Sequence, residues 1–388
     1  MIEFWDTSIT TQWGIYLLPL LSFILGIYIT RRRFKKQKKQ LRFSNDYFQG
    51  LNYLLNDEQD KALNIFIKLV ETDWETIDTS LALGAIFRRK GEIDKAIKLH
   101  QNLLARPSLP QEYKGMVLLS LAKDYLQAGW LDRAENLFNE IVENEAFTHE
   151  AQECLMSIYE KEQDWEKAIN IARRFQSKGN ITLAATTAHY YCELSQKIHS
   201  KNDLKEAEAL AIQALNADKN CVRASILLAD FAITRGRFQK AIRFLRQVEI
   251  QNEKLLPLAL DKLVLCYRNT SNLNKALSYL RSLEQKHKNI FLTPVLTSLI
   301  EEIFSKEDAL QYLIDSVHET PSLFTLNTLL QLQDSDTSQQ KTLLPTVIEA
   351  ITEKQPDYQC INCGYSANTH VWSCPSCHHW SSLIPQSL

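Results

Sequence analysis

Glycine and proline are scarce in this chain, with 10 of each among 388 residues. Turn-rich all-β folds need these residues at their many turns, so their scarcity argues against such folds and favours helices. An excess of charge of one sign is also missing, because 44 Lys and Arg stand against 46 Asp and Glu. The formal net charge of −2 argues against a protein that binds nucleic acid electrostatically along its whole length.

Motifs for catalysis and for nucleotide binding are lacking as well. The sequence contains no Ser/His/Asp motif, no phosphate loop and no dinucleotide fingerprint. We therefore expect a protein that is not an enzyme.

One long apolar run is present, near the N-terminus. Trp13–Ile29 contains 17 residues without a charge, which is a helical length of about 25 Å, or about 32 Å if the helix starts at Ile9. The hydrocarbon core of a bilayer is about 30 Å thick, so the run predicts a single transmembrane helix. A cleaved signal peptide would need basic residues before the run and small residues at a cleavage site, and both are missing.

Basic residues follow this run directly. Residues 31–42 contain eight Lys or Arg, whereas the tail before the run contains Glu3 and Asp6 and no basic residue. The positive-inside rule therefore predicts that the bulk of the chain faces the cytoplasm. We expect the basic stretch to contact an anionic membrane surface rather than nucleic acid.

A short pattern recurs along the middle of the chain: a turn residue, a polar stretch, then alanine within a helical run. The alanines are spaced by 34, 38, 34, 39, 34, 35 and 33 residues, at Ala62, Ala96, Ala134, Ala168, Ala207, Ala241, Ala276 and Ala309. A period near 34 is typical of the tetratricopeptide repeat, a pair of antiparallel helices. The sequence thus predicts an all-α superhelix of about eight repeats, with a concave groove of the kind that binds peptides or proteins. The two longer spacings predict longer loops or helices.

The residues around these alanines fit pairs of packed helices. Where the two helices of a repeat cross, a small residue is expected on the first helix, and Gly50, Gly84, Ala122 and Ala229 meet this expectation. Aromatic side chains that fill the space between helices are expected at Tyr53, Phe87, Tyr125, Tyr159 and Tyr267. Left-handed caps are expected at Gly91, Gly129 and Gly236. Four cysteines on expected helices read as buried hydrophobes rather than reactive thiols: Cys154, Cys192, Cys221 and Cys266.

The C-terminal tail contains two C-x2-C pairs, Cys360 with Cys363 and Cys374 with Cys377. Paired C-x2-C motifs predict one tetrathiolate site for a metal ion. Gly364 allows a positive φ after the first pair. A tail of about 30 residues cannot bury a stable core, so the metal must supply much of its folding energy.

Two alternatives for these cysteines are a pair of disulfides and a redox dithiol, and a reducing cytoplasm disfavours persistent disulfides. Zinc and iron both accept four sulfurs in tetrahedral geometry, so the spacing leaves the metal open. A complete set of four thiolates makes His370, His378 and His379 bystanders and leaves no open position for hydrolytic chemistry.

These features divide the chain into five parts. We expect a transmembrane anchor, a basic linker, the repeat array, a linker with a closing helix at 341–354, and a metal-binding domain, at residues 1–30, 31–44, 45–332, 333–356 and 357–388. Trp372 and Trp380 flank the second pair of cysteines, and a domain so small cannot bury both by itself. We therefore expect the metal domain to dock on the repeats.

The knuckle Y-x-C-x-x-C-G-Y, followed by C-P-x-C, resembles those of rubredoxins, which carry an electron on iron. The whole order, from one N-terminal span through a basic stretch and repeats to C-x2-C…W-x-C-P-S-C-x-x-W, is similar to the lipopolysaccharide assembly protein B family. That resemblance implies a protein of the bacterial inner membrane, with Cys360, Cys363, Cys374 and Cys377 as metal ligands of a rubredoxin-like domain. It further implies an adaptor that promotes degradation of the lipid A pathway deacetylase by a membrane-bound AAA+ protease and is antagonised by another inner-membrane regulator.

Three other functions are open at this point. The tail could be a rubredoxin-type electron carrier with the repeats as its docking platform, or the chain could be a generic membrane-tethered scaffold. A zinc ribbon could also bind nucleic acid. Residues 356–388 contain no Lys or Arg and only one acidic residue, Asp357, so phosphate attraction is absent there and no nucleic-acid partner is expected.

Overall fold

The computed structural model describes residues 77–107, 109–143, 148–176, 183–287, 292–319 and 356–386, with scattered positions between 48 and 65 and between 325 and 332. The apolar run near the N-terminus, the basic stretch and the expected closing helix lie outside these residues. Within the described part of the chain, no helix is long and apolar enough to cross a bilayer. The proposed domain boundaries stay predictions.

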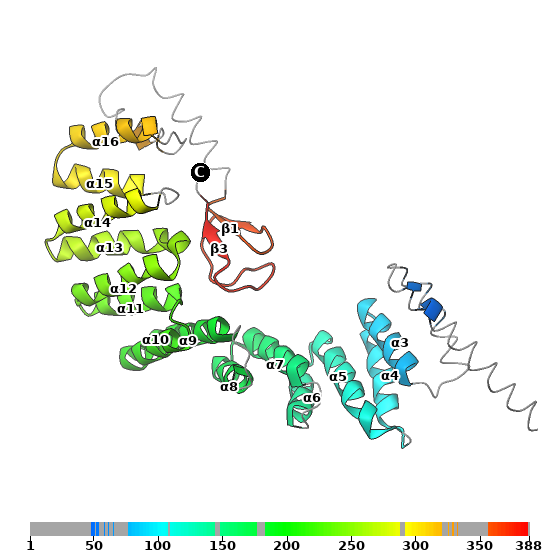
Figure 1. Ribbon diagram of the computed structural model, residues 1–388. Coiled ribbons are helices and arrows are strands. Elements are labelled where there is room, and N and C mark those ends of the chain that lie inside the picture. The colour runs from blue at the N-terminus through cyan, green and yellow to red at the C-terminus, as the bar shows by residue number, and fades with distance from the viewer. Residues whose placement is uncertain are drawn as a thin grey trace, which may run out of the picture. The chain divides into compact units, whose positions relative to one another are not determined.

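The chain divides into two compact units, Met1–Ile158 and Tyr159–Leu388. Described helices of the first unit form successive hairpins (Figure 1): α3 (Ile77–Arg89), α4 (Ile93–Leu104), α5 (Gln111–Gln127), α6 (Leu131–Glu143) and α7 (Thr148–Glu162), whose last residues belong to the second unit.

The second unit continues the helical pairs and ends in a small sheet (Figure 1). Its helices are α8 (Trp165–Gln176), α9 (Leu183–Ser200), α10 (Leu204–Ala217), α11 (Val222–Thr234), α12 (Phe238–Gln251), the 3-10 turn η1 (Glu253–Leu255), α13 (Pro257–Asn269), α14 (Leu273–Lys286), α15 (Thr293–Ile303) and α16 (Lys306–Glu319). Its strands are β1 (Tyr358–Cys360), β2 (Ser366–Ala367) and β3 (Leu383–Pro385). The predicted helical repeats are therefore confirmed.

The repeat alanines lie at the contact between the two helices of each pair. Every one that the structure describes is fully buried, with 0% exposure, including Ala207 and Ala309. A larger side chain there would hold the helices apart. The longer spacings arise from longer helices, because α5 has 17 residues and α9 has 18.

The expected glycine caps are present at the ends of α3, α5 and α11. Gly91, Gly129 and Gly236 have φ of 78°, 77° and 68°. The N–H group after each glycine donates to a carbonyl five residues earlier, at 2.8 to 2.9 Å, which is the Schellman arrangement. Gln163, Asn202 and Ser271 adopt the same positive φ in other repeats, and the sequence pattern did not reveal these caps.

A neighbouring side chain on α4 leaves no room for a side chain at Gly84. A Cβ atom at Gly84 would collide with the imidazole of His100. The buried His100 is held by Asp124 on α5, with Nδ1 and Oδ2 2.5 Å apart, and Arg88 binds the other carboxylate oxygen at 2.6 Å. Three helices of the first unit thus meet at one buried polar cluster.

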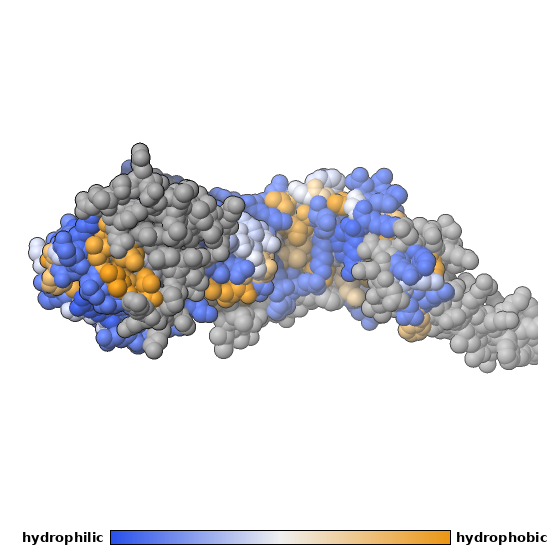
Figure 2. Space-filling view, turned by 90° about the horizontal axis from the view of Figure 1, so that it is seen from above, coloured by the Kyte–Doolittle hydropathy of each residue, from blue (hydrophilic) through white to orange (hydrophobic). Residues whose placement is uncertain are grey.

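Two expectations about the scattered cysteines were wrong in part. Cys221 precedes α11 as its N-cap residue instead of lying on the helix, and Cys154 is only partly buried. Cys192 and Cys266 are fully buried on helices as expected. On the face shown in Figure 2, hydrophilic residues alternate with separate patches of apolar residues.

Candidate metal centre

The C-terminal residues 358–386, called here the ribbon, form a three-stranded antiparallel sheet in the order β2–β1–β3. Tyr358 of β1 pairs with Ala367 of β2 and with Pro385 of β3. The buried core of the ribbon consists of only Cys360, Cys374 and Leu383. So small a core cannot stabilise a fold alone, and structural zinc sites contribute about 10–16 kcal/mol in small domains.

Two knuckles with the same backbone geometry carry the cysteines. In the first, the N–H of Gly364 donates to Cys360 O at 2.9 Å, and the N–H of Cys360 donates to Tyr365 O at 2.7 Å. In the second, the N–H of His378 donates to Cys374 O at 2.9 Å, and the N–H of Cys374 donates to His379 O at 3.0 Å. Each tight turn therefore directs its two sulfurs to the same side.

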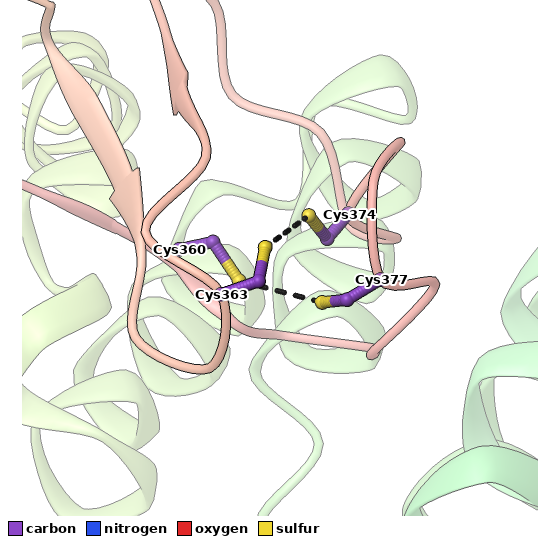
Figure 3. Close-up of side chains that lie close together, drawn as sticks. All are labelled: Cys360, Cys363, Cys374 and Cys377. Carbon is purple, nitrogen blue, oxygen red and sulfur yellow. Dashed lines mark hydrogen bonds between the residues drawn. The ribbon is translucent and has the colours of Figure 1, made fainter. Parts of the chain in front are cut away.

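The four sulfurs converge on one point (Figure 3). Cys360 Sγ lies 3.7 Å from Cys377 Sγ, and Cys363 Sγ lies 3.6 Å from Cys374 Sγ. All four lie within 4.8 Å of one another. A tetrahedral ion with metal–sulfur bonds of about 2.3 Å needs sulfurs about 3.8 Å apart, whereas a disulfide needs about 2.05 Å. The spacing fits a tetrathiolate metal site and not two disulfides.

Both knuckles need a left-handed residue directly after the second cysteine. Gly364 has φ +76°, as expected, and His378 has φ +57° at the equivalent position. Only glycine adopts this conformation without steric cost, so His378 holds it at the expense of backbone strain. The tight turn of the second knuckle requires that conformation whatever residue occupies it.

Hydrogen-bond donors favour the thiolate form at Cys377 and Cys360, whereas burial and hydrogen bonds with the other sulfurs raise the pKa of Cys363 to about 11. The side-chain amide of Asn362, together with the backbone N–H of His379, lowers the pKa of Cys377 to about 5. A hydrogen bond with the Ser382 hydroxyl, 3.3 Å from the sulfur, is the main cause that lowers the pKa of Cys360. Deprotonated sulfur is the form that binds a metal, so these donors prepare the site for an ion.

The donor set fits a structural ion of zinc or iron, held by the four predicted cysteines. Among the described residues no histidine or carboxylate joins this cluster. Four thiolates leave no open coordination position for a reacting water, and sulfur ligands alone do not choose between the two metals.

The ribbon docks on the repeats of the second unit through Trp380. The indole stacks on the imidazole of His189 in α9, with centroids 4.8 Å apart and planes 14° apart, and meets Tyr190 edge-on at 6.2 Å. Ser381 Oγ and His189 Nε2 share a hydrogen bond of 2.9 Å. Burial, reinforced by the charge of Arg223, lowers the pKa of His189 to about 3, so the stacked ring is neutral.

Trp372 forms the second contact of the ribbon with the repeats. The guanidinium of Arg223, on α11, lies 5.9 Å from the centre of the Trp372 ring. Glu193 and Gln196 hold that guanidinium at 2.8 and 2.5 Å. Trp372 and Ile384 also pack against the apolar core of the helices. Both tryptophans that motivated the docking hypothesis thus lie against the repeat helices.

A cleft of about 240 Å³ lies where the ribbon meets α9, α11 and α13. Its lining combines aromatic, apolar and charged residues: His370 and Trp372 from the ribbon, and Gln196, Arg223, Ile226, Leu227, Asp230, Leu258 and Lys262 from the repeats. Lys262 and Asp230 pair at 2.7 Å. The repeat residues of this junction were missed from the sequence, because nothing in the repeat pattern distinguishes His189 or Arg223 from other helix positions.

Comparisons with known proteins agree with this architecture. The family model described as "Rubredoxin metal binding domain" matches residues 358–385, and tetratricopeptide-repeat models match residues 79–112 and 199–260. Among solved structures, the crystal structure of MamA is similar at 20% identity, over 44% of this chain and 95% of that chain, with a TM-score of 0.30. That last likeness is too weak to carry a functional argument.

Relatives of nearly equal length are also found. Lipopolysaccharide assembly protein B of Escherichia coli (strain K12) is 32% identical over 378 residues, which cover 96% of this chain and 97% of that protein. The protein of the same name from Haemophilus influenzae (strain ATCC 51907 / DSM 11121 / KW20 / Rd) is 33% identical over 393 residues, covering 96% and 98%.

Proposed function

The chain belongs to the lipopolysaccharide assembly protein B family, and from this premise we propose that it is a non-enzymatic adaptor in lipopolysaccharide assembly. The adaptor is anchored in the bacterial inner membrane by its N-terminal apolar run, and its bulk faces the cytoplasm. It restrains lipopolysaccharide synthesis by presenting the lipid A pathway deacetylase to a membrane-bound AAA+ protease for degradation. Another inner-membrane regulator opposes it.

End-to-end similarity to the family is the observation that carries this proposal. The matched segments include both the repeats and the metal knuckles, and the ribbon is seated on α9 and α11. Helical repeats provide extended surfaces for protein partners. An adaptor needs such a surface and needs no catalytic group.

Different parts of the chain have different structural roles in the adaptor. The metal, when bound, supplies a rigid crosslink between the two knuckles. Trp380 and Ser381 then fasten the ribbon to His189, while Trp372 and Arg223 form one wall of the cleft. Because Ile226, Leu227 and Leu258 line the cleft, we propose that it receives an apolar side chain of the client.

The test is the half-life of the deacetylase in cells depleted of this protein. We expect its steady-state level to rise and its half-life to lengthen, and plasmid-borne wild-type protein to restore both. Leu258→Glu in the cleft wall should restore less than Leu265→Glu, a matched change at an exposed position of the same helix α13. An unchanged half-life after depletion would refute the proteolytic adaptor and leave a membrane-tethered scaffold.

One observation favours a second candidate, a rubredoxin-type electron carrier docked on the repeats. Cys363 is exposed on the ribbon, and an exposed ligand would bring an iron centre within reach of a redox partner. Visible colour and reversible reduction of the purified protein would support this function. A colourless, zinc-loaded protein that shows no reduction would rule it out.

A further inference from the structure

Basic residues are concentrated in one part of the second unit. Residues 235–286 contain eleven Lys and Arg but only four Asp and Glu, although the whole chain carries a net charge of −2. The remainder of the chain is therefore acidic. Such segregation of charge produces a local positive field that the overall composition conceals.

Two neighbouring helices, α12 and α14, carry most of this charge. The guanidinium of Arg246 on α12 lies 4.5 Å from the ring of Tyr279 on α14, and the Tyr279 hydroxyl donates to Glu249 at 3.0 Å. Lys286 reaches the same Glu249 at 2.6 Å. These contacts place the outer residues of the two helices on one surface, which we call the basic face.

Few acidic groups remain to neutralise the basic face. Glu249 is occupied by Lys286 and Tyr279, and Glu208 on α10 binds Arg235 and Lys240. Glu284 on α14 accepts a hydrogen bond from the Tyr312 hydroxyl at 2.5 Å. Four exposed cations have no ion-pair partner among the residues that the structure describes: Arg237, Arg243, Lys275 and Arg281. Their charge is therefore available to a partner.

An exposed aliphatic side chain lies within this face. Ile250 is 84% exposed, the highest value among the large hydrophobic residues that the structure describes as exposed. It follows Arg246 by four residues and Arg243 by seven, so the three lie on one stripe of α12. Cations that flank a protruding aliphatic residue are the combination with which proteins bind the interface of an anionic bilayer.

We propose that the basic face of α12 and α14 docks on anionic lipid headgroups, with Ile250 entering the interface. The inference rests on the membrane anchor of the proposed function, because an anchored chain holds this face at high effective concentration beside the bilayer. A lipid surface fits better than an acidic protein segment, since the cations are spread over two helices and are not gathered around a groove. Each of the four cations without an ion-pair partner among the described residues favours binding to an anionic membrane surface by about fivefold. Together they suffice to orient a domain that is already tethered to the membrane.

The experiment uses the full chain reconstituted in vesicles, with the photo-crosslinking residue p-benzoylphenylalanine in place of the exposed Gln247 on α12. Vesicles contain either phosphatidylcholine alone or phosphatidylcholine with phosphatidylglycerol. We expect lipid adducts, detected by mass spectrometry, only in the anionic vesicles and decreasing with salt. Absence of lipid adducts, equal adducts in both vesicles, or crosslinks to a second copy of the chain would overturn the proposal.

A matched pair of variants separates the basic face from charge in general. Arg243→Glu with Lys275→Glu should lower the lipid-adduct yield by about 25-fold or more, because at least two cations are lost. Lys98→Glu with Lys114→Glu makes the same change in net charge at exposed positions of α4 and α5 and should leave the yield unchanged. Equal losses in both pairs would also overturn the proposal.

Failure of the anchor is recognised separately. Flotation of the vesicles in high salt, which screens the basic face, reports whether the N-terminal run holds the chain in the bilayer. Adducts are scored at low salt in the whole mixture, whether or not the chain floats in high salt. A chain that fails to float but still forms anionic-lipid adducts would refute the anchor and support the basic face.

Discussion

His378 occupies a conformation that glycine fills in the equivalent knuckle. The φ angles are +76° at Gly364 and +57° at His378, and a Cβ at Gly364 would meet no atom within 4 Å. Space is therefore not the constraint there, and only backbone strain separates the two residue types.

A reciprocal pair of substitutions tests this interpretation. Gly364→Ala should destabilise the metal-bound ribbon by about 1–2 kcal/mol, whereas His378→Gly should stabilise it by up to about 1 kcal/mol. Competition with a chelator measures both as shifts in metal retention at equilibrium. Shifts of the same sign in both variants would contradict a role for the left-handed conformation.

His189 makes the docking of the ribbon sensitive to pH. The folded chain holds the pKa of His189 near 3 through burial and the neighbouring Arg223, against an ordinary value of 6.5. Below pH 6.5 the unfolded chain binds a proton that the folded chain refuses, so stability falls as pH decreases from about 7 toward 3. Above that window the group contributes no pH dependence.

The expected loss between pH 8 and pH 5 is about 2 kcal/mol. Urea unfolding of the second unit at both pH values measures it. Gln in the His189→Gln variant cannot titrate but can still hydrogen-bond Ser381. The free energy of unfolding of this variant should therefore fall by about 2 kcal/mol less than that of the wild-type protein between pH 8 and pH 5. Protonation of the cysteine ligands affects both proteins alike, and parallel pH curves would show that His189 is not responsible.

At the scale of helices, the alanine spacing predicted the repeats because packing allows only a small residue where two helices cross. The same reasoning identified Gly91, Gly129 and Gly236 as caps. It did not identify Gln163, Asn202 and Ser271, because residues other than glycine adopt the left-handed conformation far less often and therefore give a weaker signal in the sequence. The repeats of Ala168, Ala207 and Ala276 therefore keep the left-handed cap without its glycine.

The sequence pattern predicted a small residue at Gly84 on α3, but it did not identify His100 as the neighbouring side chain that requires one. Ala usually stabilises a helix relative to Gly by about 0.5–1 kcal/mol. Here the added methyl group would displace the buried His100 from Asp124, so Gly84→Ala should destabilise the first unit by about 2 kcal/mol or more.

A double-mutant cycle identifies the cause of that loss. In the background of His100→Ala, the Gly84→Ala change should cost little or become stabilising, because the imidazole is gone. Thermal unfolding of the four proteins gives the coupling energy. Additive effects would mean that Gly84 is needed for another reason.

At the scale of the whole molecule, the cysteine spacing predicted all four residues of the metal cluster, because a tight turn with C-x2-C spacing directs both of its sulfurs at one ion. The receiving surface on the repeats was not predictable. His189 precedes Trp372 by more than 180 residues, and a single sequence shows no periodic reason for a buried histidine there. Docking is a tertiary property, because its contacts join the ribbon to residues of α9 and α11 that lie far away in the sequence.

Loss of the metal should undo that docking while leaving the helices folded. The double substitution Cys360→Ser and Cys374→Ser removes one ligand from each knuckle, so metal content should fall below one-tenth of the wild-type value and the ribbon should unfold. Trp380 would then leave His189, and limited proteolysis of the full chain should cleave within residues 358–386 while far-ultraviolet circular dichroism keeps its helical signal. The exposed substitution Ser376→Ala, within the same knuckle, is the matched control and should retain both metal and protection. A double variant that keeps its metal would refute the ligand assignment, and one that loses metal but still resists protease would show that the docking contacts alone hold the ribbon in place.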